Sequence, residues 1–173
     1  FHDVYGANYK VSLILERLGV EVTWLAVDDC PQLGEHVKAN TAMIFMETPT
    51  NPLCRSIDIA AVRRAVDRTG ARLVVDNTFA TPYHQNPLAL GAHLVVHSAT
   101  KALGGHNDLM AGAIAGSKED YDRLWFTRQA IGTTLDAYSA SLLERGLKTF
   151  SLRAGRMAAS ALARLCVPDR GRR

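Results

Sequence analysis

Apolar residues recur along the chain in two spacings, one typical of helices and one typical of strands. The i, i+3, i+4, i+7 spacing of an amphipathic helix is carried by Val11, Ile14, Leu15 and Leu18. Residues 20–24 alternate between apolar and polar side chains, as a half-buried strand does. Continuous apolar runs predict buried strands at 43–46, 73–75 and 94–96, and a weaker, glycine-containing strand is predicted at 111–115.

Capping residues mark further helices between and after these strands. Asp58 and Ser117 each precede a helical apolar pattern, where a side-chain oxygen can cap the helix. The chain after Asp136 is mostly helical. Strands that alternate with helices predict an α/β fold, a three-layer arrangement in which a mainly parallel sheet is covered on both faces.

The polar residues that follow the predicted strands are where chemistry is expected. Ligands of open parallel sheets bind beyond the carboxyl ends of the strands. In this chain those ends are followed by residues 47–51, 76–83 and 97–101.

Composition and charge exclude several classes of protein. A length of 173 residues suits one domain, and 47% hydrophobic residues exclude an intrinsically disordered chain. No apolar stretch approaches the roughly 20 residues of a membrane-spanning helix. The net charge is +3, but residues 153–173 hold six arginines and one aspartate, so the rest of the chain is slightly acidic. The basic residues form no stripe over the body, and we expect no nucleic-acid partner and no membrane partner.

Cysteine usage and the ends of the chain bear on location and completeness. The three cysteines are scattered, with no C-x-x-C pair, which favours a reducing compartment, and we expect a cytoplasmic protein. The opening residues FHDVYGANYK contain neither an initiator methionine nor the apolar run of a signal peptide. With an ending that has no apolar pattern, this opening suggests an incomplete chain.

Asp76 and Lys101 are the candidate reactive residues at the predicted strand ends. Asp76 is either a turn or helix cap, or a permanent anion that holds a proton on a ring nitrogen of a ligand. Lys101 is either a solvated surface residue or an amine that forms a Schiff base, because its small neighbours would let a ligand approach closely. The hydroxyls of Ser98 and Thr100 suit either phosphate binding or backbone capping.

Other ligand fingerprints are missing from the sequence. It has no G-x-x-x-x-G-K-[ST] loop and no G-x-G-x-x-G. His93 and His97 would lie about 13 Å apart on a strand, which is too far to share a zinc ion. No metal site is predicted.

Four segments together resemble the Cys/Met-metabolism family of pyridoxal-phosphate (PLP) enzymes. They are VYGANY (4–9), ETPTNP (47–52), the stretch from VVDNTFATPYHQNP to HSATKALGGHNDLMAG (74–112) and RGLKTFSLR (145–153). The resemblance runs from Val4 to about Leu165. It implies the large, cofactor-binding domain of the type I PLP-dependent transferase fold, truncated at both ends. Residues 1–150 would form part of the PLP-binding α/β domain, and 151–173 would begin the helix that leads to a missing C-terminal domain.

The resemblance also implies a role for individual residues. Lys101 would form the Schiff base with pyridoxal 5'-phosphate and move protons during the reaction. Asp76 would pair with the pyridinium nitrogen, and Tyr5 would stack on the ring and act as an acid or base. Phosphate contacts would come from Ser98 and Thr100. Asn51 would lie near the phenolic oxygen of the cofactor and the substrate carboxylate.

The implied activity is transsulfuration of sulfur amino acids or activated homoserine. Within this class, γ-replacement or elimination of the cystathionine γ-synthase type comes first. Residues 106–109 depart from the more frequent family pattern and resemble some cystathionine γ-synthase-like members. A C–S lyase acting on cystathionine or methionine is the alternative, and a non-catalytic fragment without the substrate-binding domain is another. The family also implies self-association, with a dimer of dimers as the parent assembly, and an amino-acid substrate.

Overall fold

The computed structural model describes residues 1–67 and 69–165, which form two compact units. Unit 1 comprises Phe1–His97 and Ala113–Thr133, and unit 2 comprises Ser98–Gly112 and the described part of Thr134–Arg173. Apart from the boundary residues Ser98 and Gly112, the elements of unit 1 are α1 (Gly6–Arg17), η1 (Val27–Gln32), α2 (Leu33–His36), β1 (Met43–Glu47), α3 (Ile59–Val66), β2 (Arg72–Asp76), α4 (Thr81–His84), β3 (Leu94–Ser98), β4 (Gly112–Gly116) and α5 (Lys118–Ile131). Unit 2 contains α6 (Ala137–Lys148) and α7 (Phe150–Leu165).

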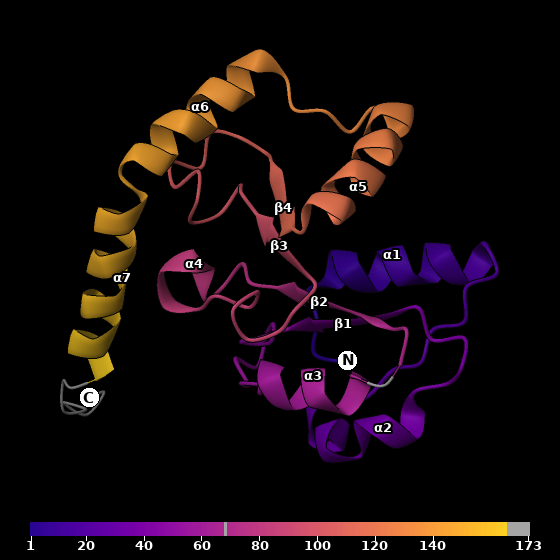
Figure 1. The fold of residues 1–173 in the computed structure, drawn as a ribbon. Helices are drawn as coiled ribbons and strands as arrows, with labels where there is room; N and C mark the ends of the chain where they lie inside the picture. The colour runs from indigo at the N-terminus through magenta and orange to yellow at the C-terminus, as the bar shows by residue number, and fades with distance from the viewer. Residues whose placement is uncertain (68, 166–173) are drawn as a thin grey trace. The chain divides into compact units, whose positions relative to one another are not determined.

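The sheet has the strand order β1-β2-β3-β4, and Figure 1 labels these four strands. β2 pairs in parallel with β1 on one side and with β3 on the other. Helices connect successive parallel strands, as parallel pairing requires. The predicted α/β fold is therefore confirmed, with a sheet that is parallel across β1, β2 and β3.

The hydrophobic core of unit 1 lies between one face of the sheet and α3. Because side chains alternate along a strand, Leu73 and Val75 share a face, and both are fully buried in the core cluster. The strand neighbours Ile44, Met46 and Val95 contribute from β1 and β3, and α3 contributes its buried apolar stripe of Ile59, Val62 and Val66. This cluster fixes the register of the three parallel strands, since a slip by one residue would turn the apolar set away from the core.

The predicted helix caps are confirmed. The Asp58 carboxylate accepts a hydrogen bond from the Ala61 N–H at 3.0 Å. Ser117 caps α5 in a capping box with Asp120, whose buried carboxylate also pairs with Arg72 of β2. The Ser117 and Arg72 hydrogen bonds lower the pKa of Asp120, so the cap of α5 is also a polar link to the sheet.

One expectation about the first 25 residues needs correction, and one is confirmed. The predicted strand at 20–24 is wrong, because the segment joins no sheet; Trp24 instead stacks on His2 and contacts the ring of Tyr9. The predicted helix is present as α1, but it buries no residue, and Val11, Ile14 and Leu18 are all exposed. Helical spacing thus predicted that a helix forms here, but it did not show that the apolar face of this helix would be exposed.

The helices of the described residues include none that is long and apolar enough to cross a membrane. The expected helix at 151–173 begins within α7, and its residues 166–173 lie outside the part of the chain that the structure describes.

A core substitution tests the packing of unit 1. Leu73→Ala removes a fully buried side chain, so we expect it to lower the free energy of unfolding by about 2–5 kcal/mol in urea titrations. Leu18→Ala, at a position that is 74% exposed, is the matched control and should change it by less than about 0.5 kcal/mol. Equal losses in the two variants would contradict the assigned core.

Candidate active site

The carboxyl ends of β1 and β2 bring two acids to one edge of the sheet. Glu47 and Asp76 are the last residues of their strands and are paired in the parallel register. Asp76 is half-buried, and its Oδ1 accepts a hydrogen bond from the Thr78 N–H at 2.9 Å. The turn after β2 is fastened to β3, since the Asn77 N–H donates to the Val96 carbonyl at 2.9 Å.

Glu47 connects this edge to the segment that carries Tyr5. Its Oε1 accepts hydrogen bonds from the Tyr5 N–H at 2.7 Å and from Asn8 Nδ2 at 2.6 Å. Glu47 is only 5% exposed, and burial raises the pKa of its carboxyl, with the nearby Asp76 charge adding to the rise. The two donors oppose that rise, because they stabilise the ionised form. Tyr5 itself is held by its backbone, and its side chain is exposed.

The sequence placed Glu47 in the segment 47–51 where chemistry is expected, but its role was missed. The motif ETPTNP was recognised, but its first residue was given no role. The available signal was a carboxylate that directly follows the apolar run of β1, because an acid there is costly to bury without donors. The donors themselves lie 39 and 42 residues away along the chain, so only the fold reveals them.

The loop after β1 is held by its own threonines and by Gln85. The Thr48 hydroxyl accepts from the Ile57 N–H at 2.9 Å, and the Thr50 hydroxyl accepts from the Arg55 N–H at 3.0 Å. The Gln85 amide donates both to the Thr48 carbonyl and to Asn77 Oδ1, at 3.0 and 2.8 Å. These bonds link the loop that contains the half-buried Asn51 to the turn that follows Asp76.

His97, on β3, is a half-buried residue of the same unit. Burial lowers the pKa of its imidazole, while the negative charge of Asp76 acts in the opposite direction. The described residues contain no group of three or more side chains that could hold a metal ion.

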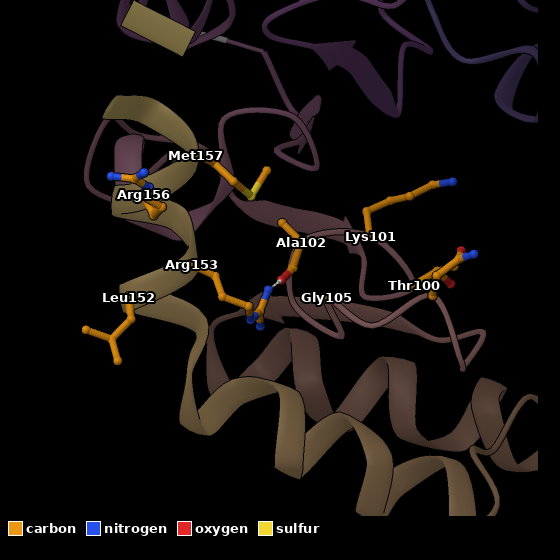
Figure 2. A pocket seen from close by; sticks show the side chains of 9 residues that line it. Thr100, Lys101, Ala102, Gly105, Leu152, Arg153, Arg156 and Met157 are labelled. Carbon is orange, nitrogen blue, oxygen red and sulfur yellow. Dashed lines mark hydrogen bonds between the residues drawn. The ribbon is translucent and has the colours of Figure 1, made fainter. Parts of the chain in front are cut away.

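Unit 2 carries the turn that follows β3, and this turn contains Lys101. Two backbone hydrogen bonds close it, from the Lys101 N–H to the Ser98 carbonyl at 3.1 Å and from the Gly105 N–H to the Lys101 carbonyl at 2.8 Å. The Lys101 side chain is exposed and extends away from α7 (Figure 2). Its ammonium forms no ion pair with any residue that the structure describes, so the amine is accessible.

The Thr100 hydroxyl makes backbone hydrogen bonds in this turn. It accepts from the Ala111 N–H at 2.9 Å and donates to the Ala111 carbonyl at 3.3 Å. The hydroxyl has a single proton, which it directs at the Ala111 carbonyl, and its oxygen keeps one free acceptor lone pair. These bonds agree with the capping interpretation of Thr100, and its contact with phosphate stays a prediction.

A pocket of about 570 Å³ lies beside the Lys101 turn, within unit 2. Figure 2 shows that its wall is formed by the turn and by the first half of α7. Its lining includes three cationic side chains and no acidic one: Thr100, Lys101, Ala102, Gly105, Asn107, Leu152, Arg153, Arg156 and Met157.

The six predicted site residues are thus divided between the units. Tyr5, Asn51 and Asp76 belong to unit 1. There Glu47 bonds to the Tyr5 backbone, and Gln85 joins the loop of Asn51 to the turn after Asp76. Unit 2 carries Ser98, Thr100 and Lys101 in one continuous turn.

The comparison with known proteins shows to which family the chain belongs. Residues 1–165 match the family described as Cys/Met metabolism PLP-dependent enzyme. The chain belongs to this family.

Similar proteins include several enzymes of sulfur amino-acid metabolism. The chain is 43% identical over 153 residues to the cystathionine gamma-lyase of Bacillus subtilis, covering 87% of this chain and 40% of that one. It is equally similar to the cystathionine gamma-synthase/O-acetylhomoserine (thiol)-lyase of the same organism, of which it covers 41%. To the L-methionine gamma-lyase of Treponema denticola it is 41% identical, covering 91% of this chain and 41% of that one.

Solved structures agree with these relatives. MetB of Corynebacterium glutamicum superposes with a TM-score of 0.83 at 41% identity, over 87% of this chain and 40% of that one. Cystathionine gamma-lyase of Lactobacillus plantarum gives the same TM-score and coverage at 36% identity. The chain therefore spans about 40% of the length of the proteins it matches.

The residues present fit the cofactor on which the family depends. A lysine-bound PLP needs an amine that carries no carboxylate partner, and Lys101 meets that need among the described residues. A protonated pyridine nitrogen needs an anion, and Asp76 supplies one at a strand end. The Asp76 carboxylate is oriented by the Thr78 N–H, and the Lys101 backbone is hydrogen-bonded within its turn.

The buried Glu47 predicts a pH dependence of stability. Because the pKa of Glu47 is raised in the folded state, its contribution to stability is complete in acid and is lost as the pH rises through the folded-state pKa. Glu47→Gln does not titrate and keeps an acceptor oxygen for the Tyr5 N–H. We therefore expect the free energy of unfolding of Glu47→Gln, minus that of wild type, to increase from about pH 4 to about pH 7 in urea titrations.

Glu16→Gln, which removes an exposed carboxylate from α1, controls for the loss of one charge. A constant difference between Glu47→Gln and wild type over the whole pH range would show that the Glu47 pKa is not raised.

Proposed function

We propose that the chain is the cofactor-binding part of a PLP-dependent transsulfuration enzyme that acts on sulfur amino acids or activated homoserine. The observation that carries the proposal is the position of Lys101, an accessible amine fixed in a hydrogen-bonded turn at the carboxyl end of β3. The match over residues 1–165 supports it, and so do relatives named as cystathionine synthases and lyases. When bound, PLP supplies an electron sink for a substrate carbanion.

In this proposal each residue has a defined task. The Lys101 amine accepts the proton from the substrate Cα and then moves protons to and from Cβ. Asp76 holds the proton on the pyridine nitrogen. Asn51 orients the substrate carboxylate, and Tyr5 acts as acid or base at the leaving group. Ser98 donates a hydroxyl hydrogen bond to the phosphate. Thr100 does so by exchanging its hydrogen bond to the Ala111 carbonyl for one to a phosphate oxygen.

The proposed domain organisation follows from the same family relationship. Residues 1–150 belong to the PLP-binding α/β domain, and α7 begins the connection to a C-terminal domain. The proposed location is the cytoplasm, which accords with free Cys30 and Cys54 among the described residues.

Self-association is part of the proposal. The apolar face of α1, where Val11 and Ile14 are 53% and 55% exposed, is the kind of surface that subunits bury against one another. The competing proposal is a non-catalytic fragment. It is suggested by the fact that the chain covers only 40% of the length of its relative. Sedimentation as a monomer without affinity for PLP would favour the fragment.

Cofactor binding tests the proposal directly. Titration of the chain with PLP should produce the visible absorbance of a lysine-bound cofactor, and Lys101→Ala should abolish it. Lys118→Ala removes a lysine that is paired with Asp122 on α5 and is the matched control, so it should leave the absorbance at the wild-type level. The same band in Lys101→Ala as in wild type would refute the assigned role of Lys101.

The reaction product separates the two proposed activities. We expect cystathionine to form from an activated homoserine and cysteine, as in γ-replacement. Release of ammonia and a keto acid from cystathionine or methionine, without that condensation, would instead assign a C–S lyase. Chromatography of the reaction mixture with each substrate distinguishes the two.

A further inference from the structure

Arg153 of α7 uses its guanidinium to hold the backbone of the Lys101 turn. Its Nη1 donates to the Ala102 carbonyl at 2.7 Å, and its Nη2 donates to the Leu103 carbonyl at 3.2 Å. Figure 2 shows the side chain reaching from α7 to the residue next to Lys101. The two bonded carbonyls are thus those of the two residues that directly follow the lysine.

The same guanidinium also bonds to two positions on the neighbouring helical segment. Nη2 donates to the Gly146 carbonyl at 2.6 Å, near the end of α6, and Nε donates to the Thr149 hydroxyl at 3.0 Å. Arginine has five N–H donors, of which these contacts use four. A single side chain therefore joins the Lys101 turn, the end of α6 and the start of α7.

Glycines provide the space that this arrangement needs. Gly105 has a positive φ of 76°, and a Cβ there would overlap the Arg153 guanidinium. A Cβ on Gly146 would overlap the Gly104 carbonyl, so α6 contacts the turn through bare backbone. Both glycines permit a close approach that any larger residue would prevent.

The contacts of Arg153 differ from those of an ordinary ion pair. Within the same unit, Arg145 pairs with the Asp108 carboxylate. Arg153 pairs with no carboxylate among the described residues, and its hydrogen-bond partners there are three carbonyls and a hydroxyl. A cation at the carbonyl end of a helix is favourable to the helix dipole, which accounts for its charge beside Gly146. Of its other contacts, the bonds to the Ala102 and Leu103 carbonyls serve the turn, and the bond to the Thr149 hydroxyl joins the turn to the start of α7.

We propose that Arg153 is a positioning residue, which fixes the turn that carries Lys101 against the ends of α6 and α7. The proposal deepens the proposed function. It rests on that function because the turn is held in place for the lysine that binds the cofactor. The planar fork of arginine is essential, because it reaches successive carbonyls of the turn and the α6 carbonyl together, and the compact ammonium of lysine does not.

Hydrogen exchange without cofactor tests the positioning by itself. The amides of Gly104 and Gly105 bond within the turn, at 2.8 Å to the Ala99 and Lys101 carbonyls. We expect Arg153→Ala to speed their exchange roughly ten- to hundredfold, since two charge-assisted bonds to the turn are lost. Arg153→Lys should give an intermediate rate. Arg164→Ala, at an exposed site on the same helix, is the control and should match wild type.

Exchange of the turn at the wild-type rate in Arg153→Ala would overturn the proposal. If that variant does not fold, Arg153→Lys decides in the same way, because full wild-type protection in it would show that the fork is not needed. A merely structural contribution would speed exchange across all of unit 2 to the same extent as in the turn, and that outcome would also overturn it.

Bound PLP provides a second, spectroscopic readout. At equal cofactor absorbance, the visible circular dichroism reports how firmly the cofactor is oriented. We expect the ratio of circular dichroism to absorbance to fall at least about twofold in Arg153→Ala and to be unchanged in Arg164→Ala. An unchanged ratio in Arg153→Ala would contradict the positioning of Lys101. If no variant and no wild-type chain binds PLP, the proposed function fails, and hydrogen exchange alone decides whether Arg153 holds the turn.

Discussion

The parallel pairing of β1, β2 and β3 is the constraint on which the rest of the structure depends. It is fixed by the alternating residues of one sheet face, such as Leu73 and Val75, which pack with the apolar stripe of α3. Because the pairing is parallel, the strands deliver their last residues to one edge. Glu47 and Asp76 meet there in register, and the chain leaving β3 enters the turn of Lys101. A core made of apolar contacts thus determines where polar chemistry is placed.

Hydrogen bonds from a few polar side chains then fix the segments that carry the candidate site residues. Glu47 holds the backbone of Tyr5, Gln85 joins the Thr48 loop to Asn77, and Arg153 holds the carbonyls after Lys101. Glu47 and Arg153 bond to the backbone beside a predicted reactive residue, and the side chains of Tyr5 and Lys101 themselves stay exposed. This separation suits an enzyme, because a positioned group contributes most when its own functional atoms remain available for the ligand.

Local signals in the sequence predicted local structure well. Asp58 and Ser117 cap helices as expected, because a cap depends on residues three positions away. The strand at 20–24 was wrong, because alternation does not supply a pairing partner, and Trp24 packs with His2 and Tyr9 instead. Glu47 and Arg153 were missed for one reason: their partners lie about 40 and 50 residues away, and no spacing rule in the sequence connects them. The family resemblance identified Lys101 and Asp76 but not the residues that hold their neighbours in place.

The role proposed for Lys101 is to bind the cofactor. It can be tested by incubating the chain with PLP, reducing it with borohydride and locating the adduct by peptide mass spectrometry. The chain has five lysines, and we expect Lys101 to be labelled at low PLP concentration before Lys10, Lys38, Lys118 and Lys148. Labelling spread evenly over the five lysines, or concentrated at another one, would contradict it.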